Sequence, residues 1–164
     1  MIQVSVVMEL SVRDMCRCPY DLHPNGCPNY GKRETCPPQA RLYHEVYDLT
    51  QPVYAVVNEF NLGEHVERMR TLHPDWSDRQ LRCVLYWQAG ARRVLSNKIF
   101  ALRECSQFPV GYVVETCPEA MGVNVTATLH GVGIELEWPP VHIVRQVALL
   151  GMPIKALKDA GRQG

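Results

Sequence analysis

Hydrophobic and polar residues follow two different rhythms along this chain, which predicts a mixture of strands and helices. Short runs rich in β-branched residues predict strands. These runs cover residues 2–12, 52–60, 111–115, 123–129, 133–138 and 141–149. Apolar residues at helical spacing predict helices over 38–49 and 63–72, and a long helix that begins after Ser77 and extends to about Leu102. The pattern favours an α/β or α+β fold, a single domain over 1–164 with a mixed sheet and packed helices.

The stretch CRCPYDLHPNGCPNYGKRETCPP, residues 16–38, interrupts this pattern. It holds four cysteines, five prolines and two glycines, and almost nothing that builds a hydrophobic core. Ordering each residue costs roughly 1–2 kcal/mol of backbone entropy. A long segment without regular structure therefore needs a function or a cross-link to hold its shape. We call residues 13–38 the cysteine-rich segment and predict that it is a metal-binding loop.

Composition and charge limit the classes of partner. Lysine plus arginine and aspartate plus glutamate each total 17 of the 164 residues, so net charge does not favour nucleic acid or an anionic membrane as a partner. No apolar run is long enough to cross a bilayer. The first residues lack the charged stretch and cleavage site of a signal peptide, so we expect a cytoplasmic protein. Walker, GxGxxG, GxSxG and HExxH motifs are absent, which leaves enzymatic activity an open question.

Seven cysteines in a chain expected in a reducing compartment indicate metal or redox chemistry rather than disulfides. The CxxC pairs usual in structural zinc sites are missing. Widely spaced single cysteines, three of them followed by proline in this segment, favour an iron–sulfur cluster, [4Fe–4S], as the cofactor. Zinc, with His23 as a further ligand, and reduced cysteines that cluster without a metal are the alternatives.

The predicted ligands are Cys18, Cys27 and Cys36. Cys16 is the weaker fourth candidate, because it alone of the four lacks a following proline and shares a tight Cys-x-Cys pair with Cys18. Three ligands would leave one metal open for chemistry on a substrate, whereas four would close the site. If Cys16 is not a ligand, the site is open to a substrate. If Cys16 is a ligand, the site is closed and an electron carrier is favoured.

The other three cysteines follow later in the chain. Cys105 and Cys117 are candidates for outer metal ligands or for unligated thiols, and Cys117 is also a candidate reactive thiolate at a helix start. Cys83 lies among helically spaced apolar residues, and a buried core position is the expectation there.

Three stretches resemble the family of predicted metal-binding proteins called domain of unknown function 2284. They are CPNYGKRETCPP (residues 27–38), KIFALREC (98–105) and CPEAMGVNVTATLHGVGI (117–134), in the order of the family's segments. The resemblance implies a diverged or shortened member that binds a metal, with an iron–sulfur cluster favoured, and it implies no established reaction. The chain departs from the family in its second segment, where only Cys105 and Cys117 remain.

Two functions are compatible with these observations. The first is a cytoplasmic iron–sulfur protein that transfers electrons to a redox partner protein or acts on a small soft or sulfur-containing substrate. The second is a non-catalytic module in which zinc or a cluster shapes a partner-binding surface.

Overall fold

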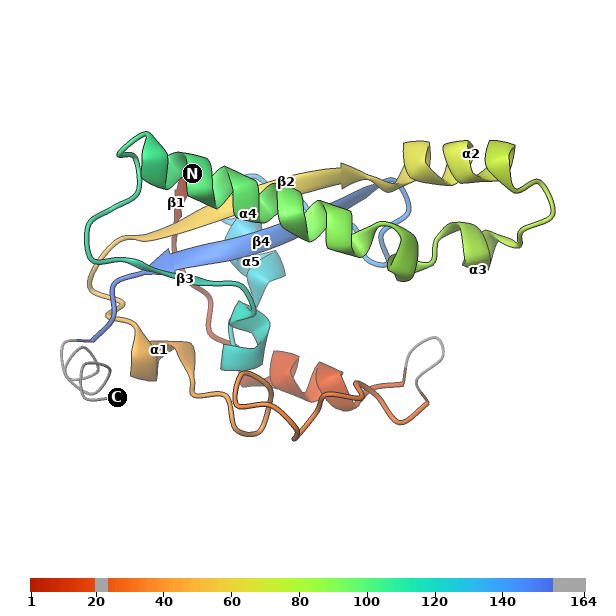
Figure 1. The fold of residues 1–164 in the computed structure, drawn as a ribbon. Coiled ribbons are helices and arrows are strands. Elements are labelled where there is room, and N and C mark those ends of the chain that lie inside the picture. The colour runs from red at the N-terminus through yellow and green to blue at the C-terminus, as the bar shows by residue number, and fades with distance from the viewer. Residues whose placement is uncertain (20–23, 155–164) are drawn as a thin grey trace. The chain divides into compact units, whose positions relative to one another are not determined.

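The computed structural model describes residues 1–19 and 24–154, and it has the α+β class that the sequence predicts. Its sheet has the strand order β1-β2-β4-β3 (Figure 1). β1 (Ile2–Val4) pairs antiparallel with β2 (Val53–Asn61), and β3 (Val113–Glu115) pairs antiparallel with β4 (Ile143–Gly151). The helices, with η for 3-10 helices, are η1 (Leu10–Arg17), α1 (Tyr43–Val46), α2 (Leu62–Leu72), α3 (Asp78–Leu81), η2 (Val84–Tyr86), α4 (Gln88–Glu104), η3 (Pro118–Met121) and α5 (Val125–His130).

Two compact units make up the chain, and each is described by itself. The first unit comprises Met1–Ala55, Val110–Ile134 and Ala148–Gly164, of which the described residues end at 154. The second unit comprises Val56–Pro109 and Glu135–Val147. The first unit therefore contains the cysteine-rich segment, and the second contains helices α2 to α4.

Tight aromatic packing forms part of the core of the first unit. The rings of Tyr43 and Tyr47 have centroids 4.5 Å apart, and both side chains are buried. Gly151, at the end of β4, lies directly against them. A Cβ atom at Gly151 would stand 2.6 Å from Tyr47 Cδ1 and 2.7 Å from the Tyr43 hydroxyl, so no larger residue fits without displacing the rings.

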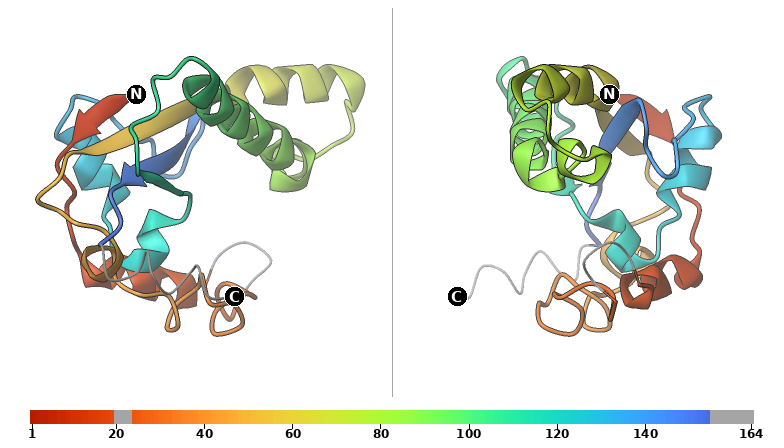
Figure 2. Two further views of the ribbon diagram at one scale, coloured as in Figure 1. Left: turned by 60° about the vertical axis from the view of Figure 1, so that its left-hand side comes forward. Right: turned by 90° about the vertical axis from the view of Figure 1, so that its right-hand side faces the viewer.

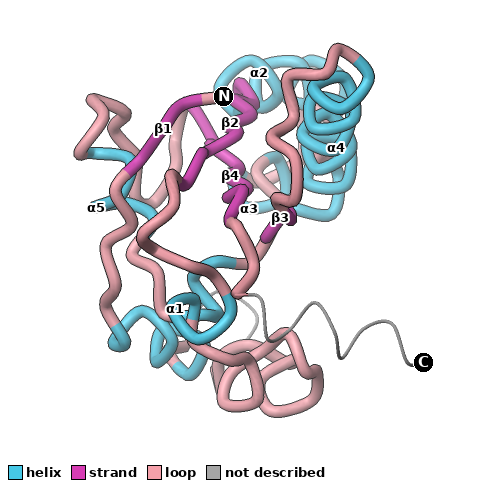
Figure 3. The backbone as a smooth tube through the Cα atoms, turned by 90° about the vertical axis from the view of Figure 1, so that its left-hand side faces the viewer, coloured by secondary structure: helices cyan, strands magenta, loops and turns pink. Residues whose placement is uncertain are grey.

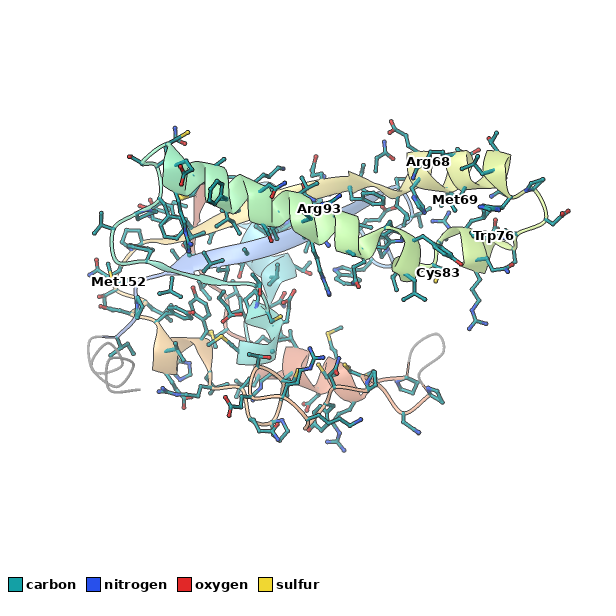
Figure 4. All side chains as sticks on the ribbon, viewed as in Figure 1. Arg68, Met69, Trp76, Cys83, Arg93 and Met152 are labelled. Atoms are coloured by element: carbon teal, nitrogen blue, oxygen red, sulfur yellow. The ribbon has the colours of Figure 1, made fainter. Side chains whose placement is uncertain are left out.

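The second unit has a core of its own, formed where α2, α3 and α4 meet. Buried side chains come from all three helices and from the turn before α4: Leu62, Val66, Leu81, Trp87 and Ala91. The Trp87 ring stacks on Phe60 with centroids 5.1 Å apart. α2 and α3 lie side by side (Figure 2). Met69 of α2 and Trp76, in the connection before α3, pack against this core (Figure 4).

Local capping decides where several elements begin. The side chain of Asn61 accepts a hydrogen bond from the Glu64 amide (3.0 Å) and starts α2, close to the predicted start. Ser77 caps a helix as predicted, but that helix is only α3, because the chain then turns at Trp87 before α4 begins. The Trp87 indole donates to the Arg82 carbonyl (3.2 Å), which holds the turn in place.

Four other element predictions are wrong. The strand expected over 2–12 ends at Val4, and residues 133–138 form no strand. The strand expected over 123–129 is helix α5, capped by the Asn124 side chain, which accepts from the Ala127 amide at 2.9 Å. Of the helix expected over 38–49, only α1 forms. No helix in the described ranges combines the length and apolar character needed to cross a membrane.

Candidate metal centre

The cysteine-rich segment begins on η1, which carries Cys16. The Cys27 amide donates to the Cys16 carbonyl at 2.7 Å, so the backbone brings these two cysteines together across the segment. Gly26 makes this approach possible. Its φ is +79°, and a Cβ atom there would lie 2.5 Å from the Cys16 carbonyl oxygen and 2.8 Å from the Arg17 carbonyl carbon.

The second half of the segment folds back through turns rather than through regular structure (Figure 3). The Gly31 amide donates to the Pro37 carbonyl at 2.8 Å, and the Gln39 side chain donates to the Gly31 carbonyl at 2.9 Å. The Ala40 amide donates to the Cys36 carbonyl at 2.9 Å. These bonds close a loop between Gly31 and Ala40 that contains Cys36.

Arg13 joins the start of the segment to its end. Its guanidinium donates to the carbonyls of Pro38 (3.1 Å) and Ala40 (2.7 Å). Leu42, directly before α1, has an extended backbone (φ −72°, ψ 148°), so the helix expected over 38–49 is limited to α1. The segment is therefore held by backbone and arginine hydrogen bonds, and its buried residues are small: Gly26 and Pro37.

The thiols of Cys27 and Cys36 act electrostatically on the Cys16 thiol. Burial is the first cause that raises the pKa of Cys16, and the neighbouring thiols of Cys27 and Cys36 raise it further. Arg13 opposes these effects. Cys16, Cys27 and Cys36 are all half-buried and carry free thiols. The segment thus collects three soft donors from three separate turns.

Cys18 has a different environment. Its side chain is exposed, and its thiol donates a weak hydrogen bond to the Asp14 carbonyl at 3.8 Å, back toward its own helix. The structure therefore gives Cys16, the weaker candidate in sequence, the more convergent position of the Cys-x-Cys pair. The absence of a proline after Cys16 made it the weaker candidate in sequence. Its position in the structure depends instead on the turn at Gly26, which the Cys-Pro pattern does not indicate.

A carboxylate that the sequence pattern does not indicate, that of Glu119, acts on the Cys16 thiol. η3 packs on η1 within the first unit, and the teal turn of η3 lies next to the red helix η1 (Figures 1 and 2). Glu119, on η3, contributes to the raised pKa of Cys16. The pKa of Glu119 is itself raised, first by burial of its carboxyl group, although part of the residue remains exposed. Nothing in the local pattern around Glu119 predicts this position, because it depends on two segments about a hundred residues apart.

The remaining candidate residues are distributed over both units. Cys117 belongs to the first unit, where it precedes η3 as an exposed residue and its amide donates to a Glu115 carboxylate oxygen at 2.7 Å. Cys105 is exposed at the end of α4, and Cys83 is half-buried before η2 (Figure 4), both in the second unit. His23 lies outside the described residues.

The thiols converge without forming a completed metal site. In residues 1–19 and 24–154, no three histidine, cysteine, aspartate or glutamate side chains already stand in an arrangement that could hold a metal ion. The donor chemistry nevertheless fits a soft metal, since Cys16, Cys27 and Cys36 supply three thiols and Glu119 one carboxylate. Such sites commonly close only when the metal binds, because metal binding and local folding are coupled.

Comparison with known proteins gives no family for this arrangement. No family model, no curated protein and no solved structure matches the chain.

Proposed function

We propose that this protein binds an iron–sulfur cluster, [4Fe–4S], in its cysteine-rich segment. Cys16, Cys27 and Cys36 are the proposed thiolate ligands, and Cys18 is the remaining thiol of the segment within the same turn as Cys16. The observation that supports the proposal most directly is the convergence of those three half-buried thiols.

Repulsion between negative groups around Cys16 is the second argument for a bound metal. A thiolate at Cys16 is repelled by the negative charges of Cys27, Cys36 and Glu119, and burial adds a desolvation penalty to its own charge. A cationic metal reverses the sign of both effects, because thiolates are its ligands and their negative charge is then neutralised. Arg13 adds one positive charge beside Cys16, which is fewer than the four negative groups require.

The shape of the segment supports the same proposal. It has turns in place of a core, and its buried members, Gly26 and Pro37, contribute little apolar surface. Hydrogen bonds of this kind contribute only about 0.5–1.5 kcal/mol each in net stability. A metal bound by several thiolates offsets the remaining entropy of ordering.

Bound in this way, a cluster supplies either one-electron transfer or a Lewis-acidic iron. The chain's own contribution is to hold the thiolates on its backbone turns and to present an exposed flank that contains Cys18. We therefore propose electron transfer to a redox partner protein, or chemistry on a small soft or sulfur-containing substrate, in the cytoplasm. Membership of the domain of unknown function 2284 family stays a prediction.

Zinc is the second candidate, and one observation favours it. The Glu119 carboxylate is an oxygen donor that acts on Cys16, and zinc accepts cysteine and carboxylate ligands in one tetrahedral site. In that case the metal would shape a partner-binding surface rather than carry electrons.

Metal analysis of protein purified without oxygen tests the proposal. Iron with acid-labile sulfide and broad visible absorption is the expected result. Stoichiometric zinc in a colourless protein would favour the second candidate, and a protein free of both metals after reconstitution would contradict the site altogether.

Serine variants assign the ligands. Cys27→Ser and Cys36→Ser are each expected to abolish stable metal incorporation, because each removes one of three converging thiolates. Cys83→Ser is the matched control, since Cys83 belongs to the second unit and should leave the metal content unchanged. A Cys16→Ser protein that keeps its cluster while Cys18→Ser loses it would return the ligand set to the one that the sequence favours.

A further inference from the structure

Positive charge is concentrated in one part of the second unit, although the whole chain has a formal net charge of zero. Residues 79–103 contain five arginines and one lysine, and no aspartate or glutamate. This stretch begins in α3 and ends at the last residue but one of α4. Acidic residues stand only at its borders, Asp78 before it and Glu104 after it. The neutral total therefore does not describe this part of the surface, whose local charge favours an anionic partner.

One flank of α4 combines this charge with an aromatic ring. Arg92, Phe100 and Arg103 follow one another along α4 at helical spacing, with the short side chain of Ser96 between the first two. Arg93 lies at the edge of the same row, and Figure 4 marks its place on α4. All of these side chains are exposed. We call the four larger residues the α4 flank: Arg92, Arg93, Phe100 and Arg103.

The arginines of the α4 flank are available to a partner. In the part of the chain that the structure describes, no carboxylate pairs with Arg92, Arg93 or Arg103. The Arg103 guanidinium lies over the Phe108 ring, 4.7 Å from its centroid. This contact orients the guanidinium without neutralising its charge.

Phe100 gives the α4 flank a flat apolar surface. Its side chain is 63% exposed, although phenylalanine is among the residues most often buried. A planar group that stacks on this ring would have guanidinium groups on both sides of it along the helix, from Arg92 and Arg103. Phe100 is also the only apolar member of the flank, which is too little for the apolar centre of an ordinary protein–protein interface.

We propose that the α4 flank binds single-stranded nucleic acid, with a base stacked on Phe100 and phosphates bound by the three arginines. Guanidinium groups pair with phosphate oxygens through two parallel hydrogen bonds. Unpaired bases stack on aromatic rings whatever their sequence. An acidic protein segment would satisfy the arginines but would offer the ring no planar partner. The inference does not depend on the proposed metal site, which belongs to the first unit.

Binding of a fluorescently labelled oligouridylate, measured by anisotropy at a series of salt concentrations, tests the role of the arginines. Three phosphate contacts predict a slope of about −2 in log K against log salt, since each contact on a single strand contributes about −0.7. The double variant Arg92→Gln, Arg93→Gln should make this slope shallower by about 1.4. Arg68→Gln is the matched control, because Arg68 is an exposed arginine on α2 (Figure 4), and it should leave the slope unchanged.

Variants of Phe100 test the stacking. Phe100→Leu keeps an apolar side chain but removes the ring, and it should weaken oligouridylate binding about fivefold or more while the salt slope stays the same. Phe100→Tyr keeps the ring and should bind as the unaltered protein does. Leu72→Ala is the control for loss of exposed apolar surface, because Leu72, at the end of α2, is also 63% exposed. It should leave the affinity unchanged.

Polyglutamate is the comparison probe, because it carries negative charge without rings. It should bind more weakly than oligouridylate, and Phe100→Leu should not affect its binding. If polyglutamate binds as tightly as oligouridylate and Phe100→Leu changes neither affinity, the α4 flank recognises acidic protein segments and the inference is overturned. It is equally overturned if the unaltered protein does not bind oligouridylate at low salt, or if the double arginine variant keeps the salt slope of Arg68→Gln.

Discussion

The cysteine-rich segment and the core of the second unit hold their shapes by different means. In the second unit, large apolar side chains from three helices meet, and Leu81 among them is fully buried. In the cysteine-rich segment, the chain is arranged by single hydrogen bonds, one arginine and one glycine turn. Apolar burial stabilises the folded state by about 25 cal/mol per Å² of buried surface, and it requires no bound ligand.

This difference indicates where the protein depends on a ligand. The second unit carries the apolar contacts that make a fold self-sufficient, whereas the cysteine-rich segment carries donor atoms without the burial that would hold them together. The two regions should therefore respond in opposite ways to metal removal and to core mutations. The chain offers convenient probes, because all three tryptophans, Trp76, Trp87 and Trp138, belong to the second unit.

Metal removal should have the largest effect, and it should be confined to the cysteine-rich segment. Chelation is expected to raise amide hydrogen exchange in residues 13–19 and 24–38 to rates close to those of an unfolded chain, because the remaining hydrogen bonds are few and the segment has little apolar core. The amides of α4 should keep their protection, as an internal control. Equal protection of the cysteine-rich segment with and without metal would show that hydrogen bonds alone hold it.

Truncation of a core leucine should have the opposite selectivity. Leu81→Ala removes a fully buried side chain from the second unit and should lower the free energy of unfolding by about 2–5 kcal/mol. Denaturation followed by tryptophan fluorescence measures this change. Leu85→Ala, at an exposed leucine on η2, is the control and should change stability by no more than about 0.5 kcal/mol. Metal stoichiometry under native conditions should be unchanged in both variants, and its loss in Leu81→Ala would show that the two regions are not separable.

The sequence predicted best those elements in which local pattern and tertiary environment agree. β2, α2 and β4 lie close to their predicted bounds because their apolar residues are both periodic and buried. The strand expected over 123–129 was wrong because the Asn124 cap outweighs the β-branched residues that follow it. The predicted helix from Pro38 was wrong because the chain forms turns before an extended Leu42, where Arg13 donates to the Pro38 and Ala40 carbonyls.

In the candidate site, too, local pattern predicts some features and tertiary contacts decide others. Composition and spacing identify the cysteine-rich segment, because it combines four cysteines with very few core-forming residues. They do not reveal that Cys16 lies nearer to Cys27 and Cys36 than its pattern suggests, because that follows from the left-handed turn at Gly26. Glu119 escapes sequence analysis entirely, because its neighbours come from η1 through packing of two short helices.

The glycine turn can be tested with a matched pair. Both Gly26 and Gly31 have positive φ, +79° and +70°, so alanine at either costs about 1–2 kcal/mol of backbone strain. At Gly31 the Cβ atom meets nothing within 4 Å, whereas at Gly26 it collides with the Cys16 carbonyl. We expect Gly31→Ala to bind metal nearly as well as the unaltered protein and Gly26→Ala to bind it much more weakly. Equal metal affinities in the two variants would refute the proposed role of the Gly26 turn.

The smallest expected effect concerns a carboxylate that braces a loop of the second unit. Glu137 accepts hydrogen bonds from the amides of His142 (2.9 Å) and Ile143 (3.1 Å), and these bonds lower its pKa to about 2. Because the pKa in the folded state lies below the ordinary value of 4.5, the ionised carboxylate stabilises the fold fully above about pH 4.5. That stabilisation is lost as the pH falls from 4.5 toward 2.

Glu137→Gln removes this charge and should make the acid-induced loss of stability shallower between pH 4.5 and 2. The measurement is chemical denaturation at a series of pH values, followed by tryptophan fluorescence so that only the second unit reports. Glu104→Gln, at the end of α4, serves as the control and should reproduce the acid limb of the unaltered protein. The metal absorbance of the first unit should fall on the same acid curve in all three proteins, since protonation of its thiolates does not involve Glu137. An acid limb that stays equally steep in Glu137→Gln would show that this carboxylate does not brace the loop, and that other groups set the acid sensitivity of the second unit.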